Sequence, residues 1–272
     1  MARELNGAEL AGFIKERQAY QVRNLRQEHG VTPKLCIIMS SGAGEVIRKY
    51  VGLKQSYAED VLIEVEVLSC EQQDMLQQIS LVNADPAVHG IIVQLPLDDV
   101  SRTDEIVAAI DPAKDVDGLG PDADYVSATA EAIDWLLSGY NIDLKDKKIA
   151  ILGQGRLVGK PLAKMWHARG YNLKTLDIDS KDTDKVLRRS DIIVTAVGTP
   201  RLVTNDRVAR NAVVVDAGTA SENGTIVGDV DEEVRERKDV SMTPKIGGVG
   251  PMTVAVMFDH VVQAALKQAG KL

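Results

Sequence analysis

Short apolar runs alternate with helical patterns along most of the chain. The runs that have the length and β-branched content of strands lie at 35–41, 61–68, 90–97, 148–153, 173–179, 191–197 and 212–218. Between these runs, apolar residues recur at helical spacing. Strands that alternate with helices are typical of parallel sheets covered by helices. The pattern therefore predicts an α/β protein.

Two groups of predicted strands are separated by residues 111–120 (DPAKDVDGLG), where proline, glycine and aspartate break the pattern. A helical pattern resumes at 123–140. The later strands look like a nucleotide-binding unit with a sheet of its own. The last helix, at about 252–270, could return to either domain. The sequence thus predicts two α/β domains, the second a Rossmann-like, doubly wound parallel sheet.

Two of the predicted helices each show one apolar side. The helix at 7–29, with Gly30 as its stop, has an apolar side made of Leu10, Phe13, Ile14, Val22 and Leu25. The helix at 45–60 has an apolar side made of Val46, Ile47, Val51, Leu53, Tyr57 and Ala58. We expect these sides to be buried.

Lys54 lies inside the apolar arc of the second helix, at about 80° when Val46 is placed at 0°. Tyr50 precedes it by one turn. A lysine in this position either packs its aliphatic stem against apolar surface while its amine reaches solvent, or its amine has a chemical role. Because partial desolvation lowers a lysine pKa, such an amine can accept a proton. Lys54 is therefore a candidate general base.

The composition is that of an ordinary globular protein, with 44% hydrophobic and 26% charged residues over 272 positions. A net charge of −8 and a pI near 5.1 argue against nucleic acid or an anionic membrane as the main partner. A protein that acts on small molecules fits better.

The two cysteines, Cys36 and Cys70, have neither the spacing of a zinc site nor that of a disulfide framework. Their apolar contexts predict buried, reduced thiols, and no metal site is expected. The N-terminal residues carry charges every few positions, which excludes a signal peptide, and no apolar run approaches about 20 residues. These features predict a cytoplasmic location.

A glycine-rich turn, ILGQGRLVGKPLA at 151–163, stands where a strand should give way to a helix. Gly153, Gly155 and Gly159 would let backbone amides approach a pyrophosphate at the helix N-terminus. The spacing is one residue longer than the common dinucleotide fingerprint. Asp177 and Asp179 follow at the end of the next strand, where a carboxylate can bind a ribose hydroxyl. The alternative is a turn that binds nothing.

Two further polar positions lie near the ends of predicted elements. Gln94 ends an apolar run at the carboxyl end of a strand, the edge where open α/β sheets bind ligands, although a satisfied turn residue is the alternative. Asp115 and Asp117 sit in KDVDG, where a capping or turn role is as plausible as a functional one. Pro96 prevents the strand that contains Gln94 from continuing as a central strand of a sheet.

Taken in order, the motifs form a specific combination over nearly the whole chain. They are Y-x-x-x-K at 50–54, VQLPL at 93–97, KDVDG at 114–118, VGKP at 158–161 and TPKIGGVGPMTVAVM at 243–257. This combination resembles the bifunctional methylenetetrahydrofolate dehydrogenase/cyclohydrolase family, known as FolD in bacteria.

The resemblance implies a folate-binding catalytic domain at 1–120, completed by the C-terminal helix at 252–272. It also implies a connecting helix at 121–139 and a Rossmann-like dinucleotide-binding domain at 140–248, with the active site in the cleft between the domains. Family members are usually homodimers. They oxidise 5,10-methylenetetrahydrofolate with NAD(P)+ and hydrolyse the methenyl product to 10-formyltetrahydrofolate, in the one-carbon metabolism that feeds purine biosynthesis.

Roles are implied residue by residue. Lys54 resembles the catalytic lysine, Tyr50 its aromatic neighbour, Gln94 its hydrogen-bond partner and Asp117 the carboxylate that holds the pterin. The substrate-closing loop matches Gly250, Pro251 and Thr253. From the glycine-rich turn and the end of the next strand, the predicted cofactor-binding residues are Gly153, Gln154, Gly155, Arg156, Gly159, Asp177 and Asp179. The two aspartates favour NAD over NADP, because a carboxylate repels a 2′-phosphate.

The chain departs from the family pattern at several places. P-A-S is replaced by Glu45, Val46 and Ile47, P-C-T-P survives only as Thr129, and G-R-S is replaced by Gly153, Gln154 and Gly155. T-P-V-P-G-G becomes T-P-K-I-G-G through Lys245 and Ile246. These changes leave two other functions open: another two-domain NAD-dependent dehydrogenase acting on a hydroxy or amino acid, or a catalytically silent nucleotide-binding scaffold.

Overall fold

The computed structural model describes residues 2–177, 179–222 and 225–271. Backbone contacts divide the chain into two compact units. One, called here the 129–253 unit, comprises Met1–Ala11 and Thr129–Thr253, and the other, the 12–128 unit, comprises Gly12–Ala128 and Val254–Leu272. Each unit is built on its own parallel sheet, which confirms the predicted two-domain α/β class.

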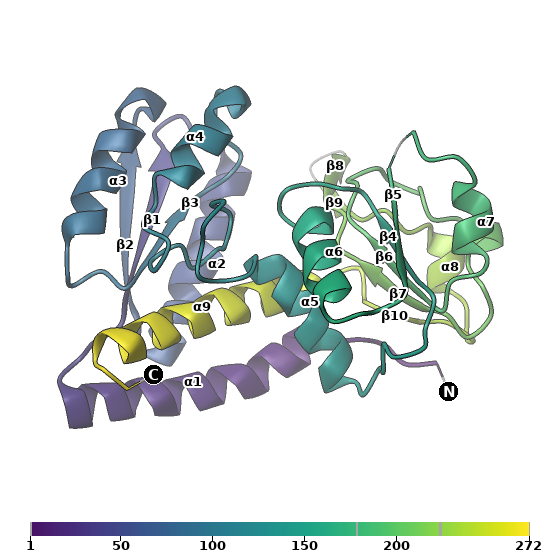
Figure 1. Cartoon of the computed structure of the whole chain (residues 1–272), viewed down its shortest axis with the longest axis horizontal. Helices are drawn as coiled ribbons and strands as arrows, with labels where there is room; N and C mark the ends of the chain where they lie inside the picture. The colour runs from purple at the N-terminus through teal and green to yellow at the C-terminus, as the bar shows by residue number, and fades with distance from the viewer. Residues whose placement is uncertain (1, 178, 223–224, 272) are drawn as a thin grey trace. The chain divides into compact units, whose positions relative to one another are not determined.

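The 12–128 unit holds a three-stranded parallel sheet in the order β2-β1-β3 (Figure 1). Its strands are β1 (Lys34–Ser40), β2 (Glu64–Cys70) and β3 (Gly90–Val93). Its helices are α2 (Glu45–Val61), α3 (Met75–Ala84) and α4 (Thr103–Ala108), with single 3-10 turns at Gln72–Asp74 and Val100–Arg102. Two long helices, α1 (Gly7–His29) and α9 (Val249–Gln268), have residues in both units.

The central strand of this sheet is the most apolar because both of its faces are covered. Six of the seven residues of β1 are buried, whereas the edge strand β2 is half-buried at five of its seven positions and exposed at Glu64 and Ser69. The core beside it is built from Cys36, Ile38, Met75, Ile79, Val82, Val88, Ile91, Val93, Leu97, Ile106 and Ile110. This core fixes the carboxyl ends of β1 and β3, where polar residues follow.

The 129–253 unit holds a five-stranded parallel sheet in the order β10-β7-β6-β4-β5 (Figure 1). Its strands are β4 (Ile149–Leu152), β5 (Leu173–Leu176), β6 (Ile192–Thr195), β7 (Val213–Asp216) and β10 (Ser241–Met242). Its helices are α6 (Gly159–Ala168), α7 (Thr183–Leu187) and α8 (Glu232–Arg235), with a 3-10 turn at Asn205–Arg207; α5 (Ala128–Gly139) precedes the sheet. The chain reverses its direction of winding between β4 and β6, where doubly wound sheets bind ligands.

Several predicted boundaries were wrong. The second strand begins only at Glu64, because α2 continues to Val61 and ends through Leu62, whose φ of 62° is left-handed. The helix predicted from residue 123 begins at Ala128, since residues 121–127 are irregular. The short hairpin of β8 (Ala220–Glu222) and β9 (Thr225–Val227) was not predicted. Short elements carry too little periodicity to be seen in sequence.

The predicted apolar sides were wrong at their edges. Phe13 is 64% exposed, Val46 58% and Leu53 54%. On α2 the buried residues are Val51, Tyr57, Ala58 and Val61. They occupy about 20° to 140° of the helical wheel, a narrower arc than expected. Lys54, at about 80°, therefore lies at the middle of the buried side rather than at its margin.

Two further expectations were wrong. Cys36 is buried, but Cys70 is only half-buried because it ends the edge strand β2; both are free thiols. Helix α9 is long and apolar enough, by length and composition, to cross a membrane. About two thirds of its most apolar stretch is buried inside the protein, as in the core helix of a globular domain.

Candidate functional site

A lysine and a glutamine meet at the carboxyl edge of the β2-β1-β3 sheet. The Nζ atom of Lys54 on α2 donates a hydrogen bond of 2.8 Å to Oε1 of Gln94, which directly follows β3. The Gln94 amide nitrogen donates to the carbonyl of Leu95 at 3.0 Å, and this bond fixes Oε1 toward the lysine. Gln94 itself is anchored because its backbone N–H donates to the carbonyl of Ile38 at 2.8 Å.

The surroundings of Lys54 shift its equilibrium toward the neutral amine. Burial lowers the pKa of Lys54, and the negative charge of Asp117 partly opposes that shift. The hydrogen bond of Nζ goes to a neutral amide, which does not hold the amine in its charged form as a carboxylate would. Tyr50, one turn earlier on α2, is half-buried. The lysine can thus exchange a proton with a bound molecule.

Asp117 lies on a tight turn that is organised by a second carboxylate. The buried side chain of Asp115 accepts hydrogen bonds from the backbone N–H groups of Gly118, Leu119 and Gly120 at 2.7 to 3.0 Å. Gly118 has a φ of 67°, and a Cβ there would come within 2.4 Å of the Val126 carbonyl oxygen. Asp115 is therefore the structural residue of this motif, and Asp117 is the one left available.

The environment of Asp117 also shifts its charge equilibrium. Burial raises the pKa of Asp117 to about 6, against the opposing positive charge of Lys54. Asp115 adds to the rise, while His260 opposes it. The pKa of Lys54 is thus lowered and that of Asp117 is raised, so the two values approach each other. Perturbed pairs of this kind are found at sites of proton transfer.

Sequence reasoning missed His260 and Tyr125. His260 is 2% exposed on α9, its Nδ1 lies 2.8 Å from the carbonyl oxygen of Val116, and its ring stacks on Tyr125 with centroids 4.7 Å apart. The signal in the sequence is the polar pair Asp259 and His260 inside the otherwise apolar run 254–262. A pattern cannot tell which turn such a histidine contacts.

The predicted substrate-closing residues do not form a loop. Gly250, Pro251 and Thr253 lie in the first turn of α9, where the Thr253 hydroxyl donates to the carbonyl of Val249 at 3.2 Å. Gly250 is exposed, and the other two are half-buried. Proline is suited to this first turn because its missing N–H has no partner there in any helix.

The glycine-rich turn between β4 and α6 has room for a phosphate. Gly153 has a φ of 86°, and a Cβ on it would lie 2.5 Å from the carbonyl oxygen of Ala196, at the end of the neighbouring strand β6. A Cβ on Gly159 would lie 1.8 Å from the carbonyl oxygen of Gly153. A Cβ on Gly155 would contact nothing within 4 Å. Two glycines thus close the turn, and the third leaves open space beside the N-terminus of α6.

The remaining predicted dinucleotide residues surround this turn. Asp177 follows β5 directly, next to Leu176, whose carbonyl accepts from the N–H of Gly153 at 2.9 Å. The backbone N–H of Asp177 donates to Ser180 Oγ at 2.8 Å, and the side chains of Asp177 and Asp179 are exposed. Gln154 donates to the carbonyl of Gly153. Arg156 lies in the turn that leads to α6. The donor set fits a dinucleotide.

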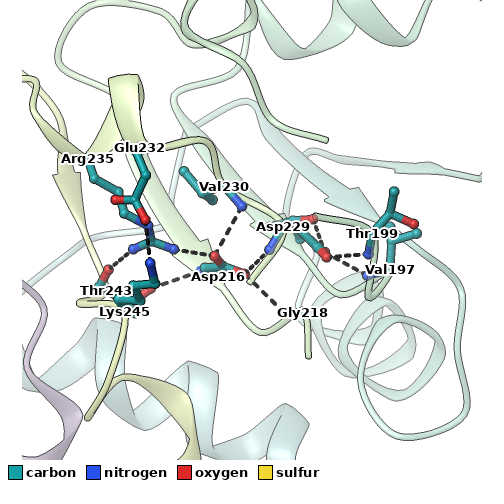
Figure 2. A network of polar contacts seen from close by, with 11 residues as sticks. Val197, Thr199, Asp216, Gly218, Asp229, Val230, Glu232, Arg235, Thr243 and Lys245 are labelled. Carbon is teal, nitrogen blue, oxygen red and sulfur yellow. Dashed lines mark hydrogen bonds and ion pairs between the residues drawn. The ribbon is translucent and has the colours of Figure 1, made fainter. Parts of the chain in front are cut away.

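Two buried aspartates tie together the other strand ends of the same sheet (Figure 2). Asp229 accepts from the N–H groups of Val197 and Thr199 at 2.9 and 2.7 Å, which holds the segment after β6. Asp216, at the end of β7, accepts from the guanidinium of Arg235 and from the N–H of Asp229 at 3.0 Å. Arg235 also donates to the carbonyl of Thr243. This network fixes the segments that follow β6 and β7.

In the part of the chain that the structure describes, no three histidine, cysteine, aspartate or glutamate side chains gather to hold a metal ion. The amine of Lys54 and the carboxylate of Asp117 belong to the 12–128 unit, and the glycine-rich turn belongs to the 129–253 unit.

Family models match both units. The tetrahydrofolate dehydrogenase/cyclohydrolase catalytic domain matches residues 5–117, and the NAD(P)-binding domain of the same family matches residues 127–269. The chain belongs to the tetrahydrofolate dehydrogenase/cyclohydrolase family. The resemblance seen in the sequence motifs is thereby confirmed.

Individual members of the family are similar over their full length. The bifunctional protein FolD of Lactobacillus acidophilus is 35% identical, with all of both chains covered. The structure of the bifunctional FolD methylenetetrahydrofolate dehydrogenase/cyclohydrolase of Campylobacter jejuni is 34% identical, has a TM-score of 0.92, and covers 98% of this chain and 99% of that one. The Trypanosoma brucei enzyme, solved with NADP and an inhibitor, is 27% identical with a TM-score of 0.91, covering 100% and 99%.

Proposed function

We propose that this chain oxidises 5,10-methylenetetrahydrofolate to the methenyl compound and hydrolyses that product to 10-formyltetrahydrofolate, with Lys54 as the proton-transferring group. The observation that carries the proposal is the contact of Lys54 with Gln94 at a strand's carboxyl edge, combined with a lowered lysine pKa. Membership of the dehydrogenase/cyclohydrolase family supports the same reaction pair.

In the oxidation, the protein's contribution is mainly to orient the folate. When bound, NAD(P)+ supplies a hydride acceptor for the methylene carbon. The glycine turn of Gly153, Gly155 and Gly159 would hold the pyrophosphate, and Asp177 the adenosine ribose. Asp117 would accept hydrogen bonds from the pterin N–H groups, which orients the ring.

In the hydrolysis, water adds to the methenyl carbon and gives up a proton. The bond from that carbon to N5 then breaks and N5 takes up a proton, which leaves the formyl group on N10. A neutral amine has one lone pair and two N–H bonds, so Lys54 can donate one N–H to Gln94 Oε1 while its lone pair accepts the proton. Gln94 adds no charge, and so it orients the amine without raising the lysine pKa. Tyr50 would lie against the folate on the same helix face.

Three of the residues that depart from the family motif are Lys245, Ile246 and Ile47, and the structure shows the surroundings of each. Lys245 pairs with Glu232 at 2.5 Å, and Ile246 is 87% exposed. Gly250, Pro251 and Thr253 would meet the substrate from the first turn of α9. The serine of P-A-S is replaced by Ile47, which is half-buried. The proposed proton transfer uses none of the side chains of Ile47, Lys245 and Ile246.

For the cofactor we propose a preference for NAD over NADP. Asp177 and Asp179 are exposed carboxylates at the end of β5, where the ribose of a bound dinucleotide lies in such sheets. The arginine of G-R-S, which could pair with a 2′-phosphate, is Gln154 in this chain. Arg156 and Lys181 are the nearby cations in sequence that act in the opposite direction.

The biological setting follows from the same family assignment. We propose a cytoplasmic homodimer in one-carbon metabolism, whose product serves formyl transfer in purine biosynthesis. The net charge of −8 supports a small-molecule substrate and neither nucleic acid nor an anionic membrane as partner.

One experiment separates this function from the two alternatives. Purified protein is mixed with 5,10-methylenetetrahydrofolate and either NAD+ or NADP+, and the methenyl absorbance is followed as it forms and decays. We expect the methenyl compound to form and then to decay by hydrolysis, and we expect its decay to be slower in Lys54→Met. Absence of any turnover would favour a silent scaffold. Turnover of a hydroxy or amino acid without methenyl formation would favour another dehydrogenase.

A further inference from the structure

The segment that follows β6 lies directly beside the glycine-rich turn. The backbone N–H of Ala196 donates to the carbonyl of Leu152, at the end of β4, at 2.9 Å. A Cβ on Gly153 would lie 2.5 Å from the carbonyl oxygen of Ala196 and 3.1 Å from Cγ2 of Val197. Val197 is nevertheless 43% exposed. The segment therefore presents an apolar side chain to solvent next to the turn assigned to the pyrophosphate.

The order of the strands indicates which half of a dinucleotide would meet this segment. In the sheet, β6 lies on one side of β4 and β5 lies on the other. The proposed function has the pyrophosphate at the turn after β4 and the adenosine ribose at Asp177, after β5. A dinucleotide that binds across the strand ends in this way extends its nicotinamide half over β6. The segment 196–199 is thus where that half would lie.

One buried carboxylate holds the segment in place (Figure 2). Asp229 is fully buried, and its Oδ2 accepts from the Thr195 hydroxyl at 2.6 Å and from the N–H of Val197 at 2.9 Å. Its Oδ1 accepts from the N–H of Thr199 at 2.7 Å. Gly198, between the two amides, has a left-handed φ of 78°, which lets the backbone turn there. Since all three of these partners are donors, an ionised carboxylate satisfies each of them.

Asp229 is itself fixed by the segment that follows β7. Its backbone N–H donates to Oδ1 of Asp216 at 3.0 Å, and Asp216 pairs with Arg235. Two glycines make room for the two carboxylates. A Cβ on Gly218 would lie 2.1 Å from Cγ of Asp229. A Cβ on Gly228 would lie 2.1 Å from Oδ2 of Asp216. The Asp229 side chain is therefore packed tightly, with little freedom to leave the segment after β6.

We propose that Asp229 is a positioning residue for the dinucleotide, which holds the segment 196–199 in the conformation that receives the nicotinamide half. A ligand that binds an already ordered segment loses less affinity to conformational entropy than one that must order it. The inference rests on the proposed use of NAD(P)+. It adds to the cofactor site a buried carboxylate that acts through the backbone of its neighbours.

The test compares the equilibrium dissociation constants of NAD+ and of ADP, which has the adenosine and the pyrophosphate but no nicotinamide, in wild type and in Asp229→Asn. The variant keeps the size of the side chain, but its NH2 group cannot accept a hydrogen bond, so at least one anchoring bond is lost. We expect the dissociation constant of NAD+ to rise by about tenfold or more, the scale of one charge-assisted hydrogen bond. That of ADP should stay within about twofold, because its groups bind at a separate place.

Cyclohydrolase activity provides a second measurement, because hydrolysis of methenyltetrahydrofolate needs no dinucleotide. Asp229→Asn should keep its cyclohydrolase rate and lose dehydrogenase activity mainly through a higher KM for NAD+. Asp231→Asn is the matched control: it makes the same change at a side chain that caps α8 by accepting from the N–H of Glu233 at 2.9 Å. Asparagine caps a helix as well as aspartate does, so this variant should behave as wild type.

A milder variant decides the question if Asp229→Asn does not fold. Thr195→Val keeps the shape of a buried strand residue and leaves both backbone hydrogen bonds to Asp229, but it removes the hydroxyl that donates to Oδ2. We expect NAD+ to bind about two- to fivefold more weakly, the scale of one ordinary hydrogen bond, while ADP binds as in wild type.

The outcomes are distinct. Equal weakening of NAD+ and ADP would overturn the inference, as would unchanged binding of NAD+ or a cyclohydrolase rate that falls together with the dehydrogenase rate. If wild type uses NADP+, the same comparison is made with NADP+ and 2′-phosphorylated ADP. A wild type that neither binds nor reduces either dinucleotide would overturn the proposed cofactor use and the inference with it. Normal wild-type turnover beside an unaffected Asp229→Asn would overturn the positioning role alone.

Discussion

The side-chain nitrogen of Lys54 and the amide oxygen of Gln94 lie 2.8 Å apart, although forty positions separate the two residues in sequence. The contact joins α2 to the end of β3 at the edge where parallel sheets bind ligands. It orients an amine whose pKa burial has lowered. The first prediction tests that amine directly.

Lys54→Met should reduce the cyclohydrolase rate by about two orders of magnitude or more, the usual scale for a general base, while dehydrogenase activity survives in part. Burial lowers the pKa of Lys54 in the folded state, so the lysine lowers the free energy of unfolding at pH values below its unfolded pKa of 10.5. The variant should therefore unfold no more easily than wild type at pH 7. Lys49→Met, on the exposed side of α2, is the control. A cyclohydrolase rate within a few-fold of wild type would reduce Lys54 to a packing residue.

Asp117→Asn should abolish turnover or raise the folate KM strongly, with dinucleotide binding unchanged, since charge-assisted hydrogen bonds are worth about 1.5 to 3 kcal/mol each. The same change should raise the free energy of unfolding at pH 7 by about 1 to 3 kcal/mol. A carboxyl whose pKa rises from 3.8 to about 6 on folding costs stability once both states are ionised, above pH 6. Denaturant titration measures this, with the exposed Asp122→Asn as control. Equal loss of folate and dinucleotide binding would indicate a structural role.

The pH profile of the two activities should differ. Folate kcat/KM for the dehydrogenase should fall as the pH drops through about 6, because Asp117 then gains a proton. Cyclohydrolase turnover should rise with pH as Lys54 loses its proton, and level off below the ordinary lysine value of 10.5. Initial rates between pH 5 and 10 test both limbs. A cyclohydrolase rate independent of pH would rule out a titrating base.

Substitution by alanine should have different effects at two glycines of the same turn: it should lower stability at Gly159 and weaken dinucleotide binding at Gly155. Gly159→Ala places a methyl group 1.8 Å from the Gly153 carbonyl oxygen, and we expect a loss of about 3 kcal/mol or more, because backbone must move. Gly155→Ala meets no atom within 4 Å, so its stability should stay within about 0.5 kcal/mol of wild type. Its dinucleotide KM should nevertheless rise, since the methyl group enters the space assigned to the pyrophosphate. An unchanged KM would place the phosphates elsewhere.

The dinucleotide preference can be tested with two exposed aspartates that lie two positions apart. We expect NAD to have the higher kcat/KM, because repulsion between Asp177 and a 2′-phosphate amounts to about 1 to 4 kcal/mol depending on solvent screening. Asp177→Ser should lower the NAD/NADP ratio, and Asp179→Ser should leave it nearly unchanged. A wild type that prefers NADP would overturn the preference, and the reverse pattern in the two variants would transfer the role to Asp179.

The helix at 45–60 shows how far a pattern reaches. Periodicity predicted the helix and the exposure of its charged side, and every charged residue of that side is exposed. It misjudged Val46 and Leu53, since the width of the buried arc depends on which neighbours cover the helix. Only the tertiary structure shows that the arc is centred on Lys54.

The sequence by itself determined the alternation of strands and helices, the glycine turn and the candidate amine, because these depend on local periodicity and on backbone conformations that only certain residues adopt. Tertiary structure alone decided which groups face one another. Val116 and His260 are 144 positions apart, and Asp216 and Arg235 come from a strand and a helix that no local pattern joins. Such contacts arise when packing buries polar groups that must then find partners, and the choice of partner depends on the whole folded chain.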